Sequence, residues 1–324
     1  MLRRTFGALS LATLAMRPAH APPAFAQGDK VSKLMVGFPP GQATDIVARL
    51  LADALKSQLG ETVIVDNKPG QGGSIVLGQV AHAAPDGTTF VLAPLASLAI
   101  NPHLYKNVAY NSLTSFEPVA RVCDLPMALV VHPSVPVKTL PELIAYAKAN
   151  PDKLSYCSAG NGTLSHVVME DCKSRAGLRI LHVPYQGSPP AMNDLVAGTV
   201  QVAIDTVTVT KPHIDSGRLR LIAAGTLERL PAFPDTPTIA EQGFPGLEAV
   251  AWLGILLPAK TPTARVKQLS DAIVKVVQEP SMQERLRSVG TIPRAMNAAE
   301  FAAFLKSEDA RWSKVVAASG IKAD

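Results

Sequence analysis

The stretch that decides the fold lies near the beginning of the chain and reads Leu34-Met35-Val36-Gly37-Phe38-Pro39-Pro40-Gly41-Gln42-Ala43-Thr44-Asp45. Its apolar start is typical of a buried strand, and the Pro-Pro-Gly turn ends that strand abruptly. From Ala43 to Leu59 apolar residues recur at three- and four-residue spacing, which predicts a helix directly after the turn. The first N–H groups of such a helix have no partner within the helix, and the helix dipole favours an anion beside them. We therefore expect this turn to form one side of a ligand-binding cleft.

Strands and helices are predicted to alternate through much of the remaining chain. After the first strand at 33–38, apolar runs bounded by turn residues predict strands at 62–65, 89–93, 154–157, 179–183, 200–204 and 219–223. Helices are expected between most of them, with Ser74 as the cap of one and Thr139 at the start of another. A loop is expected at 94–102. This alternation is typical of a parallel sheet that is covered on both faces.

Two apolar stretches lie where the chain would cross between two domains. The first, 118–132, has Pro126 in its middle, which argues against a single central strand. We expect one strand that leaves the first sheet there and a second strand that enters another sheet. The return crossing is 249–257, and the tail after it is predicted as helices only, at 263–277, 281–289 and 298–318. The expected organisation is α/β, with domain 1 at 27–125 plus 252–324 and domain 2 at 126–251.

Residues 1–26 have the pattern of an export signal. Arg3 and Arg4 precede a short apolar core, and Ala24-Phe25-Ala26 is a small-x-small cleavage site. A membrane anchor is disfavoured, since a span needs about 20 apolar residues and Arg17 and three prolines interrupt this segment. We expect export to the periplasm with cleavage near Ala26. Both the general secretory route and the twin-arginine route remain open.

Composition and charge exclude several classes of function. The formal net charge is +5, of which the three arginines of the signal contribute +3, so the mature chain carries about +2 and has no basic block for nucleic acid. No stretch after the signal is apolar enough for membrane insertion. The cysteines, Cys123, Cys157 and Cys172, have no metal-ligand spacing, so no metal or cofactor is expected. Export permits a Cys157–Cys172 disulfide, and free buried thiols are an equally good interpretation.

Four turns carry the residues that could bind a ligand, because ligands of open α/β sheets bind at the carboxyl ends of strands. The turns are rich in Gly, Ser, Thr and Asn and contain no Lys or Arg, and they lie at 39–44, 94–101, 158–163 and 185–190. An anion here would be held by backbone N–H and hydroxyl groups. Asp45 would contact the ligand or stabilise its helix, Asp205 would face the cleft or a turn, and His166 is more typical of a packed or capping histidine.

The chain resembles the Bug family, the tripartite tricarboxylate transporter receptors of the TctC type, over essentially its whole mature length. The resemblance rests on an ordered set of motifs: Phe38-Pro39-Pro40-Gly41 with Thr44-Asp45, Asn67-Lys68-Pro69-Gly70, Ser158-Ala159-Gly160-Asn161-Gly162-Thr163 with His166, His182-Val183-Pro184-Tyr185, Asp205, and Asp235-Thr236-Pro237-Thr238. It implies a two-domain periplasmic binding protein fold of type II, the Venus flytrap, with two crossing segments. It also implies capture of a small organic acid between the domains, without cofactor or covalent chemistry, and delivery to membrane permease subunits by a monomer.

Carried over from the family, the ligand site would include one set of residues from each domain. The first set is Phe38, Pro40, Gly41, Gln42, Thr44, Asp45 and Ser97, and the second is Ser158, Gly160, Gly162, Thr163, His166, Tyr185 and Asp205. The family usually has a glycine where this chain has Gln42. If that position needs a positive φ, its side chain costs about 1–2 kcal/mol; otherwise Gln42 adds a polar side chain to the cleft. Pro94-Leu95-Ala96-Ser97-Leu98 also replaces the usual Gly-Thr-Ser with a later His. Both departures predict a ligand with a more apolar or shorter distal end than a symmetric dicarboxylate.

Two other functions fit the same residues. An exported hydrolase would use Ser158, His166 and Asp205, although the common hydrolase, nucleotide-binding and zinc-protease motifs are missing from the sequence. An orphan receptor that serves sensing rather than uptake would have the same binding cleft.

Overall fold

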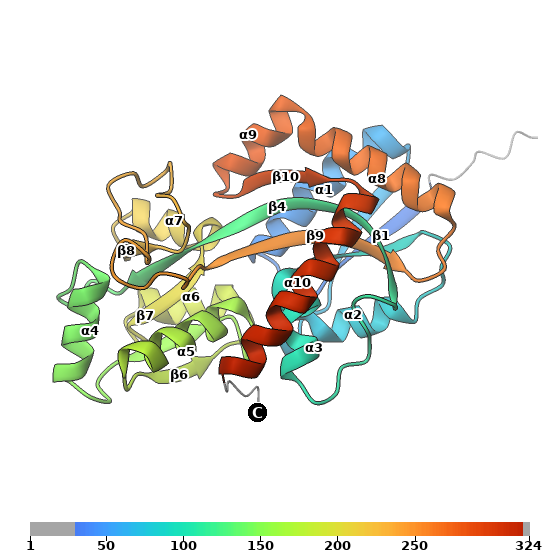
Figure 1. Cartoon of the computed structure of the whole chain (residues 1–324). Helices are drawn as coiled ribbons and strands as arrows, with labels where there is room; N and C mark the ends of the chain where they lie inside the picture. The colour runs from blue at the N-terminus through green and yellow to red at the C-terminus, as the bar shows by residue number, and fades with distance from the viewer. Residues whose placement is uncertain (1–29, 320–324) are drawn as a thin grey trace, which may run out of the picture.

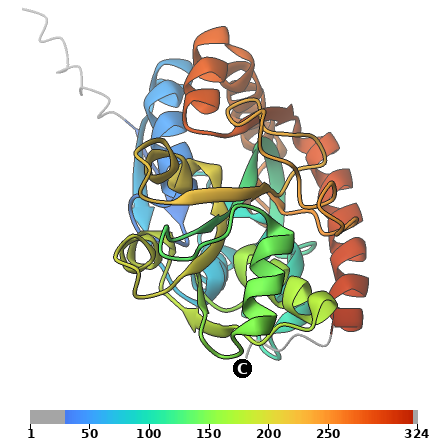
Figure 2. The same cartoon turned by 90° about the vertical axis from the view of Figure 1, so that its left-hand side faces the viewer.

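Two long antiparallel strands, β4 (Phe116–Val131) and β9 (Val250–Pro258), run side by side from one lobe of the molecule to the other (Figure 1). The computed structural model describes residues 30–319. Within these residues the strands form one ten-stranded sheet in the order β2-β1-β3-β9-β4-β7-β5-β6, with β8 and β10 paired to β4. Figure 2 shows the second lobe from its outer side, with helices around its strands. The α/β fold predicted from the sequence is confirmed, although the sheet is mixed rather than parallel, because β4 and β9 pair antiparallel with their neighbours.

The first lobe is built on three parallel strands, β1 (Val31–Val36), β2 (Thr62–Asn67) and β3 (Thr89–Pro94), and β9 continues their sheet antiparallel to β3. Helix α1 has the predicted bounds, Ala43–Leu59, because its apolar face is continuous and Gly60 ends it in the left-handed conformation at φ 63°. The helices of this lobe also include α2 (Ser74–Ala81), α3 (Asn101–Leu104), α8 (Thr263–Gln278) and α9 (Pro280–Ser288).

The second lobe repeats the same plan. Its strands are β5 (Ser155–Ser158), β6 (Leu181–Pro184), β7 (Val202–Thr206) and β8 (Arg220–Ala224), and β5 pairs in parallel with both β6 and β7. Its helices are α4 (Leu140–Ala149), α5 (Leu164–Ala176), α6 (Ser188–Val196) and α7 (Val207–Asp215). Thr139 caps α4, as predicted, by accepting a hydrogen bond from the backbone N–H of Glu142 at 3.3 Å.

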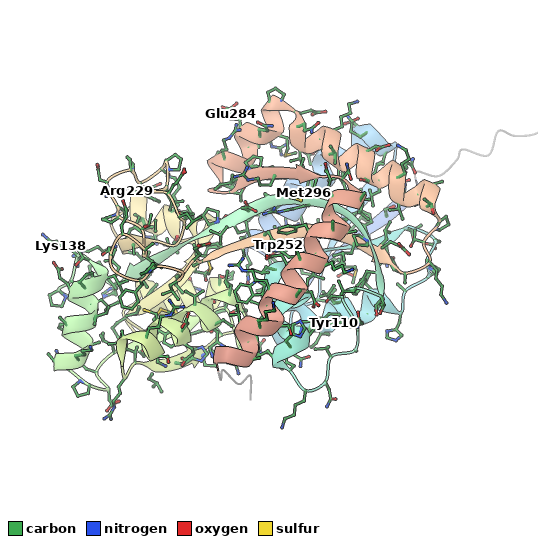
Figure 3. The ribbon with its side chains drawn as sticks, in the orientation of Figure 1. Tyr110, Lys138, Arg229, Trp252, Glu284 and Met296 are labelled. Atoms are coloured by element: carbon green, nitrogen blue, oxygen red, sulfur yellow. The ribbon has the colours of Figure 1, made fainter. Side chains whose placement is uncertain are left out.

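The last helix, α10 (Ala298–Ser319), lies across the sheet where β4 and β9 run together (Figure 1). Trp252 of β9 lies beneath it, and its indole N–H donates to Glu308 Oε2 at 2.9 Å (Figure 3). Phe301 packs edge-on to Trp252, and Gly254 makes room for it: a Cβ at Gly254 would approach the Phe301 ring to 2.1 Å. The tail therefore packs on the sheet beside the long strands. Within residues 30–319 no helix combines the length and apolar character that a membrane crossing requires.

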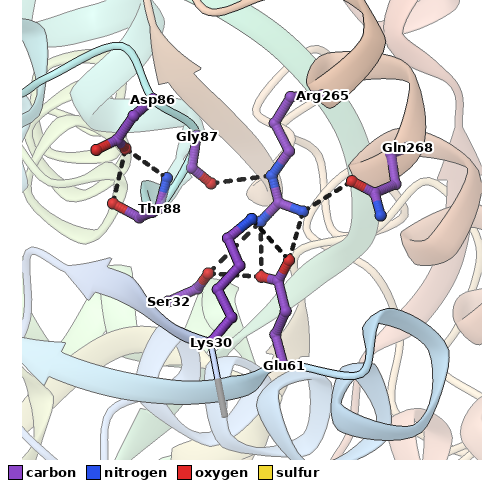
Figure 4. Close-up of polar contacts among 8 residues, drawn as sticks. All are labelled: Lys30, Ser32, Glu61, Asp86, Gly87, Thr88, Arg265 and Gln268. Carbon is purple, nitrogen blue, oxygen red and sulfur yellow. Dashed lines mark hydrogen bonds and ion pairs between the residues drawn. The ribbon is translucent and has the colours of Figure 1, made fainter. Parts of the chain in front are cut away.

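A buried ion pair joins the start of the chain to its last third (Figure 4). The guanidinium of Arg265, in α8, binds both carboxylate oxygens of Glu61 at 2.9 and 2.8 Å, and the two side chains are 8% and 5% exposed. Ser32 donates to the same carboxylate, and Lys30 lies 3.0 Å from it. Arg265 also donates to the carbonyl of Gly87. The pair is satisfied on both sides, and it fixes α8 to β1 and β2.

The structure corrects the prediction of two strands separated at Pro126. β4 is one continuous strand, and Pro126 lies where the strand changes neighbours: its pairing with β9 ends at Pro126, and its pairing with β7 begins at Met127. A proline has no N–H to donate, and at this position neither ladder needs one. The tail also contains a strand that was not predicted, β10 (Ile292–Met296), which pairs antiparallel with β4 through an irregular register.

Two smaller predictions were wrong, one alternative that the sequence left open is decided, and one prediction falls outside the described residues. The segment at 94–102 is helical, with a π-helical turn, η2 (Ala96–Ile100), that continues into α3. Gly73, at φ 88°, occupies the cap position of α2, so that Ser74 is the first helical residue and its hydroxyl instead contacts Asn101 and Tyr110. All three cysteines are free and buried, so the Cys157–Cys172 disulfide is absent. The signal at 1–26 lies outside the described residues.

Candidate ligand-binding site

The turn between β1 and α1 has the shape that its sequence suggests. Gly41 is at φ 85°, and its N–H donates to Asp45 Oδ2 at 2.9 Å. Gln42 occupies the cap position of α1 in an extended conformation, at φ −78°, and no side chain caps the helix. A side chain at this position is therefore unstrained, and the conditional cost of replacing a glycine there does not arise.

Both carboxylate oxygens of Asp45 accept hydrogen bonds from groups in or next to the turn. Arg49 donates to both of its oxygens at 3.0 and 2.9 Å, and Asn67 donates to Oδ1 at 2.9 Å. Asn67 also donates to the carbonyl of Phe38. Burial acts to raise the pKa of Asp45, but the hydrogen bonds from Arg49, Gly41 and Asn67 and the charge of Arg49 together hold it below its usual value. These contacts are those expected of the helix- and turn-stabilising role, one of the two roles that the sequence left open for Asp45.

In the second lobe, the turn before α5 is shaped by two glycines with positive φ. Gly160 is at φ 124° and its N–H donates to Ser158 Oγ, while Gly162 is at φ 74° and its N–H donates to His166 Nδ1. The hydroxyl of Thr163, the cap residue, donates backwards to the carbonyl of Gly160 at 2.6 Å and does not cap the helix. The first turn of α5 is therefore left without a side-chain cap, as is that of α1.

Both of these uncapped helix starts line one small hollow between the lobes, with a volume of about 50 Å³, which we call the inner hollow. Its polar residues are Gln42, Thr44, Thr163, Ser165, Asp205 and Thr206, and its apolar residues are Phe38, Ala43, Pro94, Ala96, Leu125, Met127, Ala159, Leu164 and Ala251. Two helix dipoles point their positive ends at the same space, which favours an anion there.

A larger space of about 320 Å³, which we call the outer cavity, adjoins the inner hollow, because Phe38 and Ala159 line both. It is lined mainly by the loops of both lobes: 37–39, 69–72, 159–161 and 184–187, with Tyr105. No Lys or Arg is among the described residues that line either space. An anion bound here would be held by backbone and hydroxyl groups, as the composition of the four turns predicted.

The lobes touch each other beside these spaces. Gln42 Oε1 accepts a hydrogen bond from the N–H of Ser188, at the start of α6, at 3.0 Å. Tyr105 donates from its hydroxyl to the carbonyl of Asn161 at 2.8 Å. Gly187 lies so close to the first lobe that an added Cβ would be 2.5 Å from Pro39 Cγ. The structure thus has its two lobes in contact, with the inner hollow between them.

Asp205, at the end of β7, is the carboxyl group of the inner hollow. It is 4% exposed, and its Oδ1 accepts from the N–H of Thr206 at 2.6 Å. Burial raises its pKa to about 6, against the opposing effect of the nearby Ser188 hydroxyl and of the hydrogen bonds from Thr206. Near neutral pH a fraction of this carboxyl is protonated, and a protonated carboxyl donates a hydrogen bond to an anionic oxygen.

The structure brings together part of the predicted site residues. Phe38, Gln42, Thr44, Thr163 and Asp205 line the inner hollow, and Phe38, Gly160 and Tyr185 line the outer cavity. The others line neither space: Pro40, Gly41, Asp45, Ser97, Ser158, Gly162 and His166. Ser97, for example, is buried and donates to the carbonyl of Gly72 at 2.7 Å.

Other lining residues were not predicted. Asn161 lies in the turn that ends at Thr163, and Ser165 lies in the first turn of the helix that follows. Both are within three residues of Thr163, so the motif that predicted Thr163 could also have indicated them. Leu125, Met127 and Ala251 come from the long strands, where the sequence indicates a crossing but gives no sign of which side chains face the inner hollow. The predicted hydrolase triad is not assembled: Ser158 Oγ lies 2.7 Å from His182 Nε2 rather than His166, and Asp205 faces Thr206 and Ser188.

Two α/β lobes, two connecting strands and a hollow between the lobes, lined by a helix start from each, define a two-lobed binding protein of the periplasmic type. The family model described as "Tripartite tricarboxylate transporter family receptor" matches residues 47–321, and the chain belongs to this family. A relative from Pseudomonas sp. strain P51, the "UPF0065 protein in tcbD-tcbE intergenic region", is 40% identical over 87% of this chain and 84% of its own length.

Solved structures agree with this assignment. The periplasmic binding protein BugD superposes with a TM-score of 0.87 at 36% identity, over 90% of this chain and 98% of BugD. R. palustris Rpa4515, solved with adipate, superposes with a TM-score of 0.88 at 33% identity, over 91% of this chain and 99% of that one. The resemblance to the Bug family and the two-lobed binding-protein fold inferred from the sequence are therefore confirmed.

Proposed function

We propose that this protein is a periplasmic receptor that captures a small carboxylate between its lobes and delivers it to the permease subunits of a tripartite transporter. One observation carries the proposal: the uncapped starts of α1 and α5, from opposite lobes, line the same hollow. Each contributes free N–H groups and the positive end of its dipole. A carboxylate between them would contact both lobes at once and so favour their closure.

The lining suggests which acids would fit. The carboxylate would lie among Thr44, Thr163 and Ser165, with the carboxyl of Asp205 as a further donor when protonated. The carbon chain would lie against the apolar side of the inner hollow and against Phe38, toward the outer cavity. Among the described lining residues there is no Lys or Arg that could pair with a second carboxylate. We therefore keep the proposal that the distal end of the ligand is shorter or more apolar than that of a symmetric dicarboxylate.

The lobes would move as the two predicted domains, 27–125 with 252–324 and 126–251, about the two long strands. β4 and β9 are the segments that connect them, and β4 changes its pairing partner at Pro126. The chain would reach the periplasm through the signal at 1–26 and act there as a monomer. Binding without turnover would distinguish it from an enzyme. The hydrolase alternative has no assembled triad, because Ser158 contacts His182 while Asp205 contacts Thr206.

A panel of acids tests the proposal. Thermal shift and calorimetry with hexanoate, benzoate, adipate, malate and citrate should show saturable binding, with the monocarboxylates hexanoate and benzoate binding more tightly than adipate, malate and citrate. If none of these acids binds, the proposal of a carboxylate receptor is wrong. If adipate, malate or citrate binds best, the proposal of an apolar or shorter distal end is wrong, while the proposal of a carboxylate receptor stands. Proton NMR of the mixture over hours should show no product.

A further inference from the structure

Beneath the turn at 158–163 lies a stack of three rings. His166, from α5, and His182, from β6, are parallel, with ring centroids 4.4 Å apart and planes within 12°. Tyr156, from β5, stacks on the other face of His182 at 4.6 Å. Each histidine belongs to one of the motifs on which the family resemblance rests, but neither ring lines the inner hollow or the outer cavity. Their polar contacts are with the turn.

The hydrogen bonds of the turn require a bare nitrogen on His166 and favour one on His182. The N–H of Gly162 is only a donor, so His166 Nδ1, at 3.3 Å, accepts from it and carries no proton. Ser158 Oγ accepts from the N–H of Gly160, and the one acceptor for its own hydroxyl proton among residues 30–319 is His182 Nε2 at 2.7 Å. We therefore assign both rings the neutral state, with His166 protonated on Nε2 and His182, whose tautomer gives the Ser158 hydroxyl its acceptor, protonated on Nδ1.

The surroundings of the stack favour this neutral state. Burial lowers the pKa of His166 and lowers that of His182 to about 4, and each ring opposes a charge on the other. The charged groups that face the stack are Glu170 and Lys173, both from α5. Glu170 Oε1 accepts from Lys173 Nζ at 2.6 Å and from the Tyr156 hydroxyl at 2.5 Å, so its charge is already compensated.

We infer that His166 and His182 are positioning residues for the bound acid: as neutral acceptors they hold the backbone of the turn at 158–163, and the turn in turn places Thr163 and the start of α5 at the inner hollow. The inference rests on the proposed function, since it assigns these rings a part in acid binding. Protonation of either ring removes its acceptor and releases Gly162 or Ser158. The affinity for the acid should then fall as the pH is lowered.

A metal site is the other use of these residues, because ligand atoms of His166, Glu170 and His182 lie within 4.8 Å of one another. The geometry opposes it. Imidazole lone pairs lie in the ring plane, so two parallel stacked rings cannot both direct a lone pair at one ion. The carboxylate of Glu170 is also already paired with the ammonium group of Lys173. One nitrogen of each ring is also engaged by the turn. Zinc binding at this stack is therefore an outcome that would overturn the inference.

Amide side chains provide matched variants at each ring. An Asn places its oxygen close to the position of Nδ1, and a Gln places it close to that of Nε2, so His166→Asn and His182→Gln keep the acceptor, while His166→Gln and His182→Asn misplace it. Calorimetry should show that each misplacing variant binds adipate about ten-fold or more weakly than its acceptor-keeping partner. Thermal melts of all four variants check that they fold. Equal affinities within each pair would overturn the inference.

The pH profile separates the rings from the other titrating groups. Asp205 and adipate itself titrate in the same range in every variant, so the informative quantity is the ratio of the wild-type affinity to that of the double variant His166→Asn/His182→Gln. This ratio should fall by at least about two-fold between pH 7 and pH 4, because His182, with a pKa of about 4, is half protonated at pH 4 and protonation of His166 adds to the fall. A ratio that stays constant would show that the protonation of the rings has no part in binding.

A ligand-free measurement keeps this inference distinguishable from the proposed function. Long-range ¹⁵N spectra of the ring nitrogens at about pH 7 should show His166 in the Nε2–H tautomer and His182 in the Nδ1–H tautomer. Hydrogen exchange of the Gly162 amide should be faster in His166→Gln than in His166→Asn. If adipate fails to bind the wild type but these results hold, the receptor proposal fails for this acid and the rings still position the turn. The opposite tautomers, or tight zinc binding abolished by either misplacing variant, would overturn the inference.

Discussion

Closure of the lobes depends on the absence of a side chain at Gly187. This residue precedes α6 at φ 115° and ψ 170°, and an added Cβ would lie 2.5 and 2.7 Å from Pro39 Cγ and Cδ and 2.8 Å from Gln42 Oε1. Ordinary carbon contacts begin at about 3.5 Å. The Pro39 ring is rigid and belongs to the turn that carries Gln42, so Gly187→Ala would push the two lobes apart by up to about 1 Å at this contact.

Two costs follow from this substitution, and different measurements detect them. The backbone strain of a side chain at this φ, about 1–3 kcal/mol, is present whether the lobes are open or closed, so it lowers the melting temperature. The overlap with Pro39 exists only when the lobes are closed. Overpacking of this kind costs about 1–3 kcal/mol, which weakens the binding of an acid by about 5- to 150-fold.

Calorimetry with adipate on wild type and Gly187→Ala measures the second cost. Gly217→Ala is the matched control, because Gly217 has a positive φ of 70° and nothing within 4 Å of an added Cβ. The control should show a lower melting temperature with unchanged affinity. If Gly187→Ala binds adipate within about two-fold of wild type, the acid does not require the contact between the lobes seen in this structure.

Three further substitutions test the site and its support. Asp205→Asn should stabilise the protein by up to about 3 kcal/mol at pH 8 and by almost nothing below pH 4. The reason is that the pKa of Asp205 in the folded state, about 6, lies above its ordinary value of 3.8, so the wild type loses stability as the pH rises between these two values. Urea unfolding at several pH values measures it, and a difference independent of pH would refute the assignment. Asp45→Ala should weaken adipate binding while the protein still folds, because it frees Gly41, Arg49 and Asn67 at a cost of about 1–3 kcal/mol; calorimetry and circular dichroism check it, and retained affinity would leave Asp45 with helix stabilisation alone. Glu61→Gln should destabilise by about 3–5 kcal/mol, since it leaves Arg265 charged and buried; urea unfolding measures it against the exposed-pair control Asp271→Asn, and equal effects would contradict the buried network.

Local sequence signals predicted the elements whose causes are local. The bounds of α1 follow from its apolar periodicity and from Gly60, and both lie within the helix or next to it. The start of α4 follows from Thr139 and Glu142 in the same way. The facing turns and the absence of Lys and Arg from the lining were also visible in the sequence, because turn composition is local.

The elements that were missed have causes far away in the chain. Pro126 is tolerated in β4 only because β9 ends its pairing there and β7 begins, and no window around Pro126 contains that information. The short strand β10, with Pro293 inside it, depends on its pairing with β4. The carboxylate of Asp45 is hydrogen-bonded by Arg49, one helical turn away, and by Asn67, at the end of β2. The second of these partners is brought to Asp45 only by the folded sheet, so the sequence alone did not show that the carboxylate is already hydrogen-bonded.

Gln42 shows how one side chain decides where an anion would be held. Three helices start beside the contact between the lobes, α1, α5 and α6, and none has a side-chain cap from its own cap residue. The amide oxygen of Gln42 accepts from the N–H of Ser188, the first residue of α6. This bond satisfies a donor of α6, while the first turns of α1 and α5 still face the inner hollow. A glycine at this position would leave all three helix starts open to an anion. Gln42 therefore joins the lobes, and in the proposed function it would restrict the carboxylate to the space between α1 and α5.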